Sequence, residues 1–189
     1  MSMRKLSFFL ALVLIGTTIQ AQSTWKSDNA HSKIGFAITH LMISEVEGHF
    51  GEFDITATAG NDFNNAAFDV TIQVASIDTD NENRNNHLKS PDFFAAEEHP
   101  VMSFKSTNFE KTGDKTFTLK GDLTMHGVTK PVTLAGKVNG IITDQRSQKL
   151  KAGLKLTGTV NRLEFGVGSD TPTLGDDVEL NINLEMAQQ

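Results

Sequence analysis

The sequence predicts an all-β domain: an antiparallel barrel of about eight strands, with a short helical insert between the third and the fourth. Two observations carry this prediction. Apolar and polar residues alternate with a period of two over most of the chain, which places them on opposite faces of a strand. Turn-forming residues separate the alternating segments. Strands buried on one face and joined by short turns indicate an antiparallel meander, and closure into a barrel removes its edges.

Six segments alternate clearly. Their apolar faces fall, in chain order, within residues 34–38, 68–74, 117–125, 132–138, 152–160 and 180–186. Two less regular stretches, residues 45–58 and 101–110, complete about eight strands. Gly51 is expected to mark a bulge, because the apolar residues before it fall out of phase with Phe53 and Ile55 after it. A two-sheet sandwich shows the same alternation, so periodicity alone leaves that architecture open.

Residues 77–100 form a long connection without this alternation. Within it, Ser90-Pro91-Asp92 has the signature of a helix start: a hydroxyl at the N-cap, proline at the first helical position and an acid in the first turn. Two adjacent phenylalanines follow. Loops of this length in a compact domain are usually functional or disordered. We therefore expect a helical lid that carries aromatic side chains.

Three glycines, Gly121, Gly136 and Gly158, lie on the apolar faces of expected strands. A packed core fills such a face with large side chains, whereas glycine leaves space for a ligand or for a neighbouring backbone. Glycine also lets a barrel strand bend. The sequence leaves both explanations open.

The first residues predict export. A short cationic start is followed by an apolar run over residues 6–15 and by the small residue Ala21. This order is typical of a secretory signal peptide, here residues 1–21, and leaves residues 22–189 as one domain. The run is shorter than the about 20 apolar residues that span a bilayer, so we expect no stable membrane insertion. With no cysteine in the chain, neither a Cys-linked lipid anchor nor a disulfide framework is available. The expected location is the periplasm or the medium.

The formal net charge of −6 argues against nucleic acid and anionic membrane surfaces as partners. The six histidines show no H-E-x-x-H or comparable spacing, and thiolates are absent, so no metal site is expected. No G-x-S-x-G elbow or phosphate-cradling glycine loop is present. We therefore expect no catalytic residues and no cofactor.

Short motifs spread over nearly the whole chain form an ordered set. The first are Trp25 with Asp28, His31-Ser32, Phe36, His40, Gly48 with Phe50, and Ser76-Ile77-Asp78-Thr79. Then come Arg84 with His87-Leu88, Asp92-Phe93-Phe94, His99-Pro100, Gly121-Asp122-Leu123-Thr124 with Gly127-Val128-Thr129, and Asn161-Arg162 with Phe165-Gly166. Together they resemble the YceI family of periplasmic, lipocalin-like polyisoprenoid-binding proteins. No single motif is decisive, but the ordered set is highly specific.

The resemblance implies an eight-stranded antiparallel lipocalin-like barrel with a helical insert, holding an isoprenoid tail in its interior. Ligands in the family are polyprenyl diphosphates, quinones and other long-chain amphiphiles, and homodimers are common. True lipocalins carry a Gly-x-Trp signature near the first strand. Trp25 has no such glycine before it, so the kinship to lipocalins is architectural.

An amphiphile needs an apolar tube and polar contacts at its mouth. The candidate tail contacts are Phe36, Phe50, Phe93, Phe94, Phe104, Phe117, Leu123 and Phe165. The candidate head-group contacts are His40, Arg84, His87 and Arg162, because guanidinium binds phosphate oxygens in pairs and imidazole can donate to a carbonyl or phosphate. Two structural explanations compete with these roles. The aromatic rings can simply pack together, and the arginines can brace the insert through acids such as Asp78 or Asp92.

Three functions are compatible with the sequence. The leading hypothesis is a carrier or sequestering protein for a long-chain isoprenoid or similar lipid. The second is an enzyme acting on such a lipid, with His40 or His87 as acid or base. The third is a stress-related scaffold with a packed core.

Overall fold

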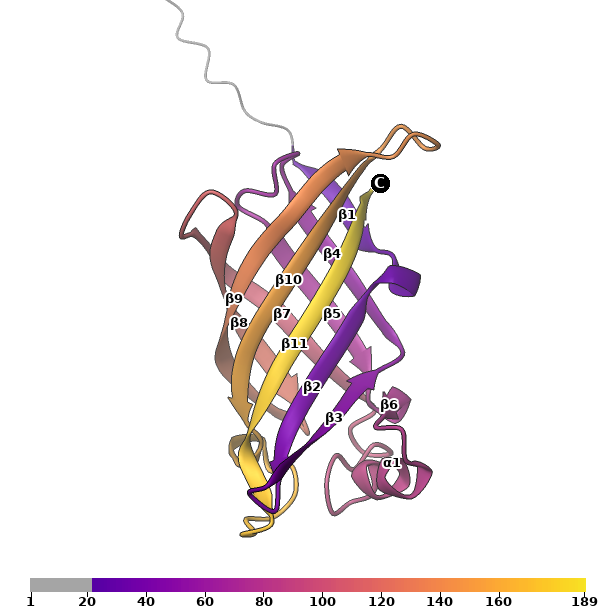
Figure 1. The fold of residues 1–189 in the computed structure, drawn as a ribbon, viewed down its shortest axis with the longest axis vertical. Coiled ribbons are helices and arrows are strands. Elements are labelled where there is room, and N and C mark those ends of the chain that lie inside the picture. Colours follow the sequence, from indigo (N-terminus) through magenta and orange to yellow (C-terminus); the bar gives the residue numbers. More distant parts are fainter. Residues whose placement is uncertain (1–21) are drawn as a thin grey trace, which may run out of the picture.

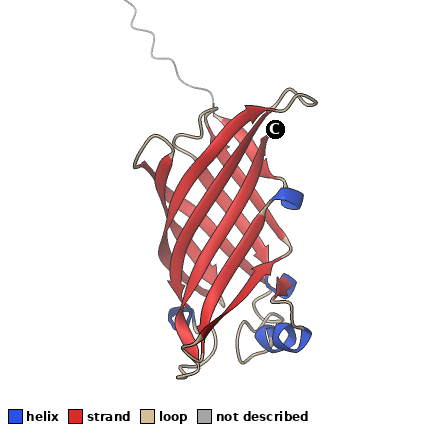
Figure 2. Ribbon diagram, in the orientation of Figure 1, coloured by secondary structure: helices blue, strands red, loops and turns tan. Residues whose placement is uncertain are grey.

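The structure is a computed structural model that describes residues 22–189, so the predicted signal peptide over residues 1–21 lies outside the described residues. The strands are β1 (Ser23–Ser27), β2 (Lys33–His40), β3 (Ser44–Phe50), β4 (Phe53–Ala59), β5 (Ala67–Gln73), β6 (Ile77–Asp78), β7 (Val101–Lys111), β8 (Thr116–Met125), β9 (Val128–Thr143), β10 (Leu150–Asn161) and β11 (Leu174–Gln188). The helices are α1 (Glu82–Lys89) and the 3-10 turns η1 (Asn29–His31), η2 (Val74–Ser76) and η3 (Arg162–Phe165) (Figure 2). No helix within residues 22–189 is both long and apolar enough to cross a bilayer.

The strands close into one antiparallel barrel (Figure 1). Hydrogen-bonded neighbours run β1-β4-β5-β7-β8-β9-β10-β11, and β11 pairs with β1 again. β2 follows β1 along β11, β3 pairs with β2, and β6 pairs with β3. β2 therefore occupies the same position around the barrel as β1, β3 the same position as β4, and β6 the same position as β5. The result is eight positions around a closed barrel, as predicted, and the sandwich alternative is excluded.

The expected irregularity at Gly51 is a break shared by two neighbouring strands. β3 ends before it and β4 begins after it, while η2 separates β5 from β6 on the facing side. The Gly51 N–H donates to the carbonyl of Ser76 at 3.0 Å, and the Gln73 N–H donates to the carbonyl of Glu52 at 2.9 Å. The break redirects both strands, as bulges in barrels do.

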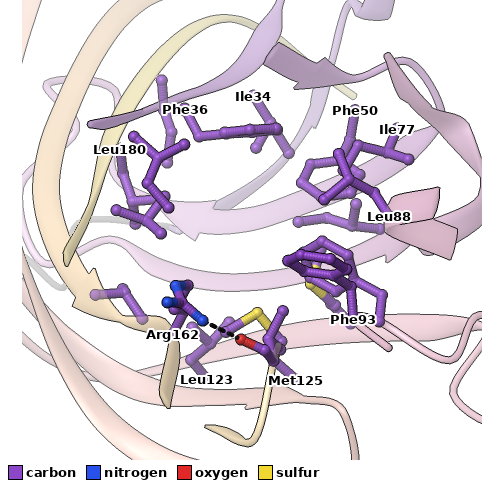
Figure 3. A pocket seen from close by; sticks show the side chains of 18 of the residues that line it. Ile34, Phe36, Phe50, Ile77, Leu88, Phe93, Leu123, Met125, Arg162 and Leu180 are labelled. Carbon is purple, nitrogen blue, oxygen red and sulfur yellow. Dashed lines mark hydrogen bonds between the residues drawn. The ribbon is translucent and has the colours of Figure 1, made fainter. Parts of the chain in front are cut away.

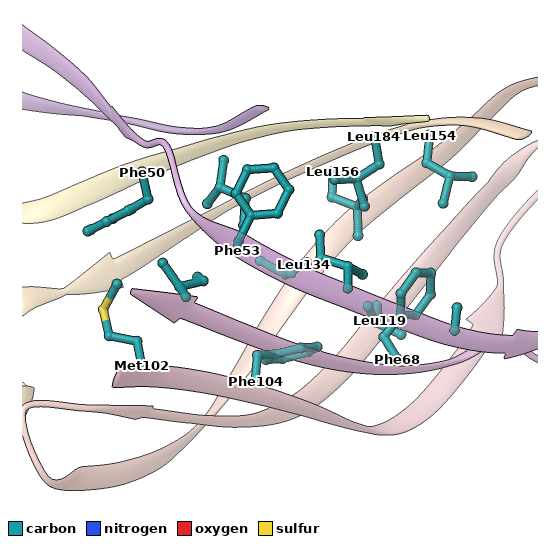
Figure 4. Close-up of a cluster of buried hydrophobic side chains, with 14 of the residues drawn as sticks. Phe50, Phe53, Phe68, Met102, Phe104, Leu119, Leu134, Leu154, Leu156 and Leu184 are labelled. Atoms are coloured by element: carbon teal, nitrogen blue, oxygen red, sulfur yellow. The ribbon is translucent and has the colours of Figure 1, made fainter. Parts of the chain in front are cut away.

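A tightly packed core fills one end of the barrel. Trp25 is 0% exposed, and its indole N–H donates to the carbonyl of Ala59 at 3.3 Å. Its ring meets Phe63 edge-on, with 4.7 Å between centroids. Leucine and phenylalanine side chains from the surrounding strands continue this core (Figure 4). The edge contact between these large aromatic rings fills the interior of the barrel around Trp25.

The insert contains a helix, but not where the sequence predicted it. α1 begins after Asn81, whose side chain accepts from the Arg84 N–H at 3.0 Å. Ser90 lies at the C-terminal cap instead, and its hydroxyl donates to the carbonyl of His87 at 2.7 Å. The predicted helix start at Ser90 is therefore wrong. A Ser-Pro-Asp sequence also suits a turn, and asparagine at position 81 is an equally good N-cap that the prediction overlooked.

The inward-facing glycines make room for side chains of neighbouring strands. A Cβ added at Gly121 would collide with the ring of Phe104, and one at Gly136 with the ring of Phe117. A Cβ at Gly158 would meet a methyl group of Leu134. These glycines are thus covered by atoms of neighbouring strands, which argues against the alternative that they leave space for a ligand.

Candidate functional site

A cavity of about 560 Å³ lies inside the barrel, beyond the packed end (Figure 3). This volume falls within the range typical of ligand pockets. Along β8 the lining residues extend from Leu119 to Met125, about 20 Å of strand at the usual rise per residue. The cavity is therefore elongated, and its existence disfavours the packed-core scaffold.

The polar side chains on the cavity wall gather at one end. They are His40, Thr79, Arg84, His87, Arg162, Ser169, Thr171 and Thr173. They come from the end of β2, the insert that holds α1, and η3 with the loop after it, which lie at the same end of the barrel (Figure 1). The opposite end of the cavity is lined by apolar side chains such as Ile55, Phe68 and Leu119. We call the polar end the mouth.

Six of the eight predicted tail contacts line this cavity: Phe36, Phe50, Phe93, Phe94, Phe104 and Leu123. The other two do not. Phe117 stacks on Phe109, with 4.5 Å between ring centroids, and covers Gly136. Phe165, the last residue of η3, is buried in the core and 2% exposed. Alternation predicts which face of a strand points inward, but it does not say where along the barrel the packed core ends and the cavity begins.

The insert covers one side of the cavity with apolar side chains. Leu88 of α1 and the two phenylalanines after it lie on the wall. Phe94 meets Phe50 of β3 edge-on, with 6.1 Å between centroids, and its N–H donates to the carbonyl of Leu88 at 3.0 Å. Phe93 meets the ring of His87 at 5.0 Å. The insert is thus packed onto the barrel through the residues expected to form a lid.

A hydrogen-bonded network anchors α1 to β6. The Asn85 side chain accepts from the N–H and the hydroxyl of Thr79, at 2.9 and 2.6 Å, and donates to Asp78 at 3.0 Å. Arg84 donates from Nε to the Thr79 hydroxyl at 2.8 Å and from Nη2 to the Thr79 carbonyl at 2.5 Å. The hydrogen bond from Asn85, followed by one from the Asp80 N–H, lowers the pKa of the Asp78 carboxyl. Arg84 is therefore held at the mouth by Thr79, not by an acid.

Arg162 is buried, with 3% of its surface exposed. Its Nε donates to the carbonyl of Gly175 at 2.8 Å, and its Nη1 donates to the carbonyl of Val167 at 3.0 Å. Its Nη2 donates to Asp176 at 3.3 Å and to the carbonyl of Leu174 at 3.5 Å. This guanidinium joins the loop after η3 to the barrel. One open explanation was that the arginines brace the insert through an acid. The acid that Arg162 contacts is Asp176. The suggested partners behave differently, since Asp78 contacts Asn85 and Asp92 contacts His87.

The two candidate histidines also reach the mouth. His40 ends β2, and His87 lies in the last turn of α1. The His87 Nε2 lies 3.4 Å from a carboxylate oxygen of Asp92, and both side chains are well exposed. The structure thus brings all four predicted head-group residues to one end of the cavity, while their contact with a ligand stays a prediction.

The family model for the YceI-like domain matches residues 25–186. The chain belongs to the YceI family. It is 35% identical to Protein YceI of Escherichia coli O157:H7 over 100% of this chain and 98% of that protein.

Solved structures share the barrel of this YceI-family chain. The YCEI protein of Campylobacter jejuni superimposes with a TM-score of 0.73 and 35% identity, over 86% of this chain and 96% of that one. A domain from Saccharophagus degradans, described as polyisoprenoid-binding and implicated in plant cell wall breakdown, shares the fold at a TM-score of 0.64 and 11% identity, over 87% of this chain and 98% of that one.

The sequence analysis missed several residues of the mouth of this YceI-family barrel. Thr79 is 3% exposed and accepts both side-chain hydrogen bonds of Arg84. It belongs to the motif Ser76-Ile77-Asp78-Thr79, which was a signal that it is important. Ser169, Thr171 and Thr173 also lie on the wall. They belong to an irregular loop, where no periodicity indicates which side chains point inward.

One cluster outside the cavity offers metal-type ligands. Atoms of Asp28, His31 and Glu185 lie within 4.8 Å of one another. Lys151 already occupies this cluster, because its Nζ lies 2.7 Å from Glu185 and 3.9 Å from Asp28. The hydrogen bond with His31 lowers the pKa of Asp28, and the one with Glu185 raises the pKa of Lys151. We interpret the cluster as ion pairs that tie η1 to β10 and β11.

Proposed function

We propose that this protein binds a long-chain isoprenoid or a similar amphiphilic lipid inside the barrel, as a periplasmic carrier or sequestering protein. The observation that carries the proposal is the shape and polarity of the cavity, which is elongated and apolar with polar groups only at the mouth. An amphiphile has the same distribution of polarity. The polyisoprenoid-binding description of the Saccharophagus degradans domain, which has the same fold, supports the assignment.

The energetics of burial favour a ligand with a long apolar tail. Burying one CH₂ group contributes about 0.8 kcal/mol, so a five-carbon isoprene unit contributes roughly 3–4 kcal/mol before losses. Ordering of the chain and lost translational freedom reduce this gain considerably. A few units inside the cavity therefore suffice for useful affinity without a charged contact. We propose the six cavity-lining residues of the predicted set as contacts of the tail.

For the head group we propose Arg84, His40 and His87 as the contacts. Within residues 22–189, the Nη1 group of Arg84 donates to no protein atom, so it has capacity left for a phosphate or carbonyl oxygen. Arg162 differs, because four contacts already occupy its guanidinium. We expect Arg162 to act on the architecture of the mouth.

The test of the proposal is to extract the protein from its native host and identify co-purifying lipids by mass spectrometry. A stoichiometric isoprenoid or similar amphiphile would support it. Incubating the purified protein with that lipid then separates a carrier from an enzyme, because only an enzyme converts it. An empty barrel that also takes up no prenol or quinone in solution would reject the proposal.

We expect Arg84→Ala to weaken a polyprenyl diphosphate roughly tenfold or more relative to the matching uncharged prenol. A hydrogen bond to a charged group is worth about 1.5–3 kcal/mol, and about 1.4 kcal/mol corresponds to a factor of ten in affinity. Titration of both lipids against each variant measures the effect. Lys89→Ala is the matched control, since it removes a cation from the same helix at a position off the cavity wall. Equal losses for the two lipids would reject the head-group role.

The carrier role also requires export. We expect the protein recovered from the periplasm of a Gram-negative host to begin at or near Gln22, because residues 1–21 resemble a signal peptide. N-terminal sequencing of the periplasmic and membrane fractions checks this. Recovery as an uncleaved membrane protein would contradict the proposed location.

A further inference from the structure

The turn between β2 and β3 exposes three consecutive large apolar side chains. Leu41, Met42 and Ile43 are 48%, 77% and 84% exposed. The tight turns of β-hairpins usually hold glycine, asparagine or aspartate, which tolerate a positive φ. Here Leu41 and Met42 have φ angles of 52° and 59°, although side chains of this size rarely adopt that conformation. We call residues 41–43 the apolar tip.

The apolar tip is held firmly by its backbone. The Leu41 N–H donates to the carbonyl of Thr173 at 2.8 Å, and the Ile43 N–H donates to the carbonyl of His40 at 3.2 Å. His40 also pairs with Ser44 across the turn and with Leu174 of β11. With the backbone bonded toward the barrel, the three side chains project into the solvent. The tip is thus an ordered apolar projection.

This projection stands beside the mouth of the cavity. The residue before it, His40, lies on the cavity wall, and so do Thr173 and Leu174, which contact the turn. Figure 1 shows the β2–β3 turn at the same end of the barrel as α1 and the loop that leads into β11. A surface that holds the tip would therefore face the polar end of the cavity.

Size argues against a protein as the partner. Stable protein interfaces bury about 800 Å² on each side, far more than three side chains supply. Insertion into the interfacial region of a bilayer needs only exposed apolar side chains and no complementary shape. Elsewhere within residues 22–189, the exposed large apolar residues Val101 and Ile142 stand singly.

Charge indicates what kind of bilayer the tip would meet. Neither of the segments that flank the tip, residues 34–50 and residues 163–179, contains a lysine or arginine. Both flanking segments carry exposed carboxylates, among them Glu45, Glu47 and Asp170. The insert at the same end, residues 77–100, has Arg84 and Lys89 but six acids, so it too is acidic. An anionic membrane attracts basic segments and repels acidic ones. A zwitterionic surface is therefore the better match.

We propose that the apolar tip inserts reversibly into the interface of a zwitterionic bilayer and holds the mouth of the cavity against it. A lipid tail could then pass between bilayer and barrel without crossing water. This second step rests on the proposed function, whereas the attachment of the tip to the bilayer does not.

The test measures co-sedimentation of the purified chain, from Gln22 onward, with phosphatidylcholine vesicles. We expect the wild type to bind, and Ile43→Asp to lower the vesicle partition coefficient at least about tenfold, because a charge replaces the apolar side chain that enters the bilayer. Ile142→Asp is the matched control: it makes the same change at an exposed residue of β9 and should leave binding intact. Thermal melts of both variants verify that the barrel folds.

Several outcomes would overturn the proposal. They are absence of wild-type binding, equal losses in Ile43→Asp and Ile142→Asp, and tighter binding to phosphatidylglycerol vesicles at low salt. A wild-type dimer that Ile43→Asp converts to a monomer would instead identify the tip as a contact between two copies of the chain.

A second assay separates this inference from the proposed function. Uptake of geranylgeraniol supplied from dilute aqueous solution should be equal in the wild type and Ile43→Asp, while its extraction from phosphatidylcholine vesicles should be slower in the variant. If the wild type binds vesicles through the tip but takes up no prenol, the proposed function fails and the membrane contact stands. Equal extraction rates would reject the role of the tip in transfer.

Discussion

Arg162→Met should lower the free energy of unfolding by about 3–5 kcal/mol, the usual loss when one partner is removed from a buried charged network. Arg162 is 3% exposed. Its guanidinium donates to the carbonyl of Val167 in the loop after η3, to the carbonyls of Leu174 and Gly175 at the start of β11, and to Asp176. Methionine fills part of the space but leaves those acceptors without their donor. For a domain of this length the melting temperature should fall on the order of 10 °C. Urea and thermal unfolding measure both quantities.

Arg146→Met supplies the matched control, because Arg146 is exposed in the turn between β9 and β10. Surface substitutions of this kind usually change stability by no more than about 0.5 kcal/mol. The bracing role would be refuted by an Arg162→Met protein that melts like the wild type yet selectively loses a diphosphate ligand. That pattern would restore Arg162 to the head-group contacts, as the sequence first suggested.

The strands were predictable because each is buried on one face only. On β10, for example, Ala152, Leu154 and Leu156 are buried while Lys155 and Thr157 are exposed, so the period of two is written directly in the sequence. A closed barrel and a two-sheet sandwich share this pattern, and only the pairing of β11 with β1 distinguishes the barrel from the sandwich. The helix in the insert was misplaced because two equally good cap sequences, at Asn81 and Ser90, compete over a short distance.

The site was less predictable, since its geometry depends on contacts between distant segments. Residue type indicated that arginines would be important, and both lie on the cavity wall. Their partners could not be anticipated: Arg84 donates to Thr79, and Arg162 donates mainly to backbone carbonyls of the loop after η3 and of the start of β11. Likewise, space for a ligand was one of two explanations for Gly121, but the ring of Phe104 from the neighbouring strand covers it. Sequence patterns describe the face of a strand and not what lies across from it.

Leu123→Trp should abolish uptake of an isoprenoid lipid while leaving the barrel folded. Leu123 lies on the cavity wall, where β8 runs between β7 and β9, so the added ring would occupy space that the tail needs. Displacing one isoprene unit removes roughly 3–4 kcal/mol of burial, which corresponds to at least about a hundredfold loss of affinity. Titration with geranylgeraniol, together with a thermal melt, measures both effects.

The comparison variant is Asp122→Trp, which adds the same ring one residue away on the exposed face of β8. It should bind the prenol like the wild type. Prenol uptake and the melting temperature together distinguish a barrel with a cavity from one with a packed core. Forcing extra bulk into a packed core typically destabilises it by about 1–3 kcal/mol. A Leu123→Trp protein that melts at a lower temperature but still takes up the prenol would mean that the tail does not occupy this cavity. Loss of uptake with an unchanged melt would place the tail beside Leu123, between the mouth and the packed end.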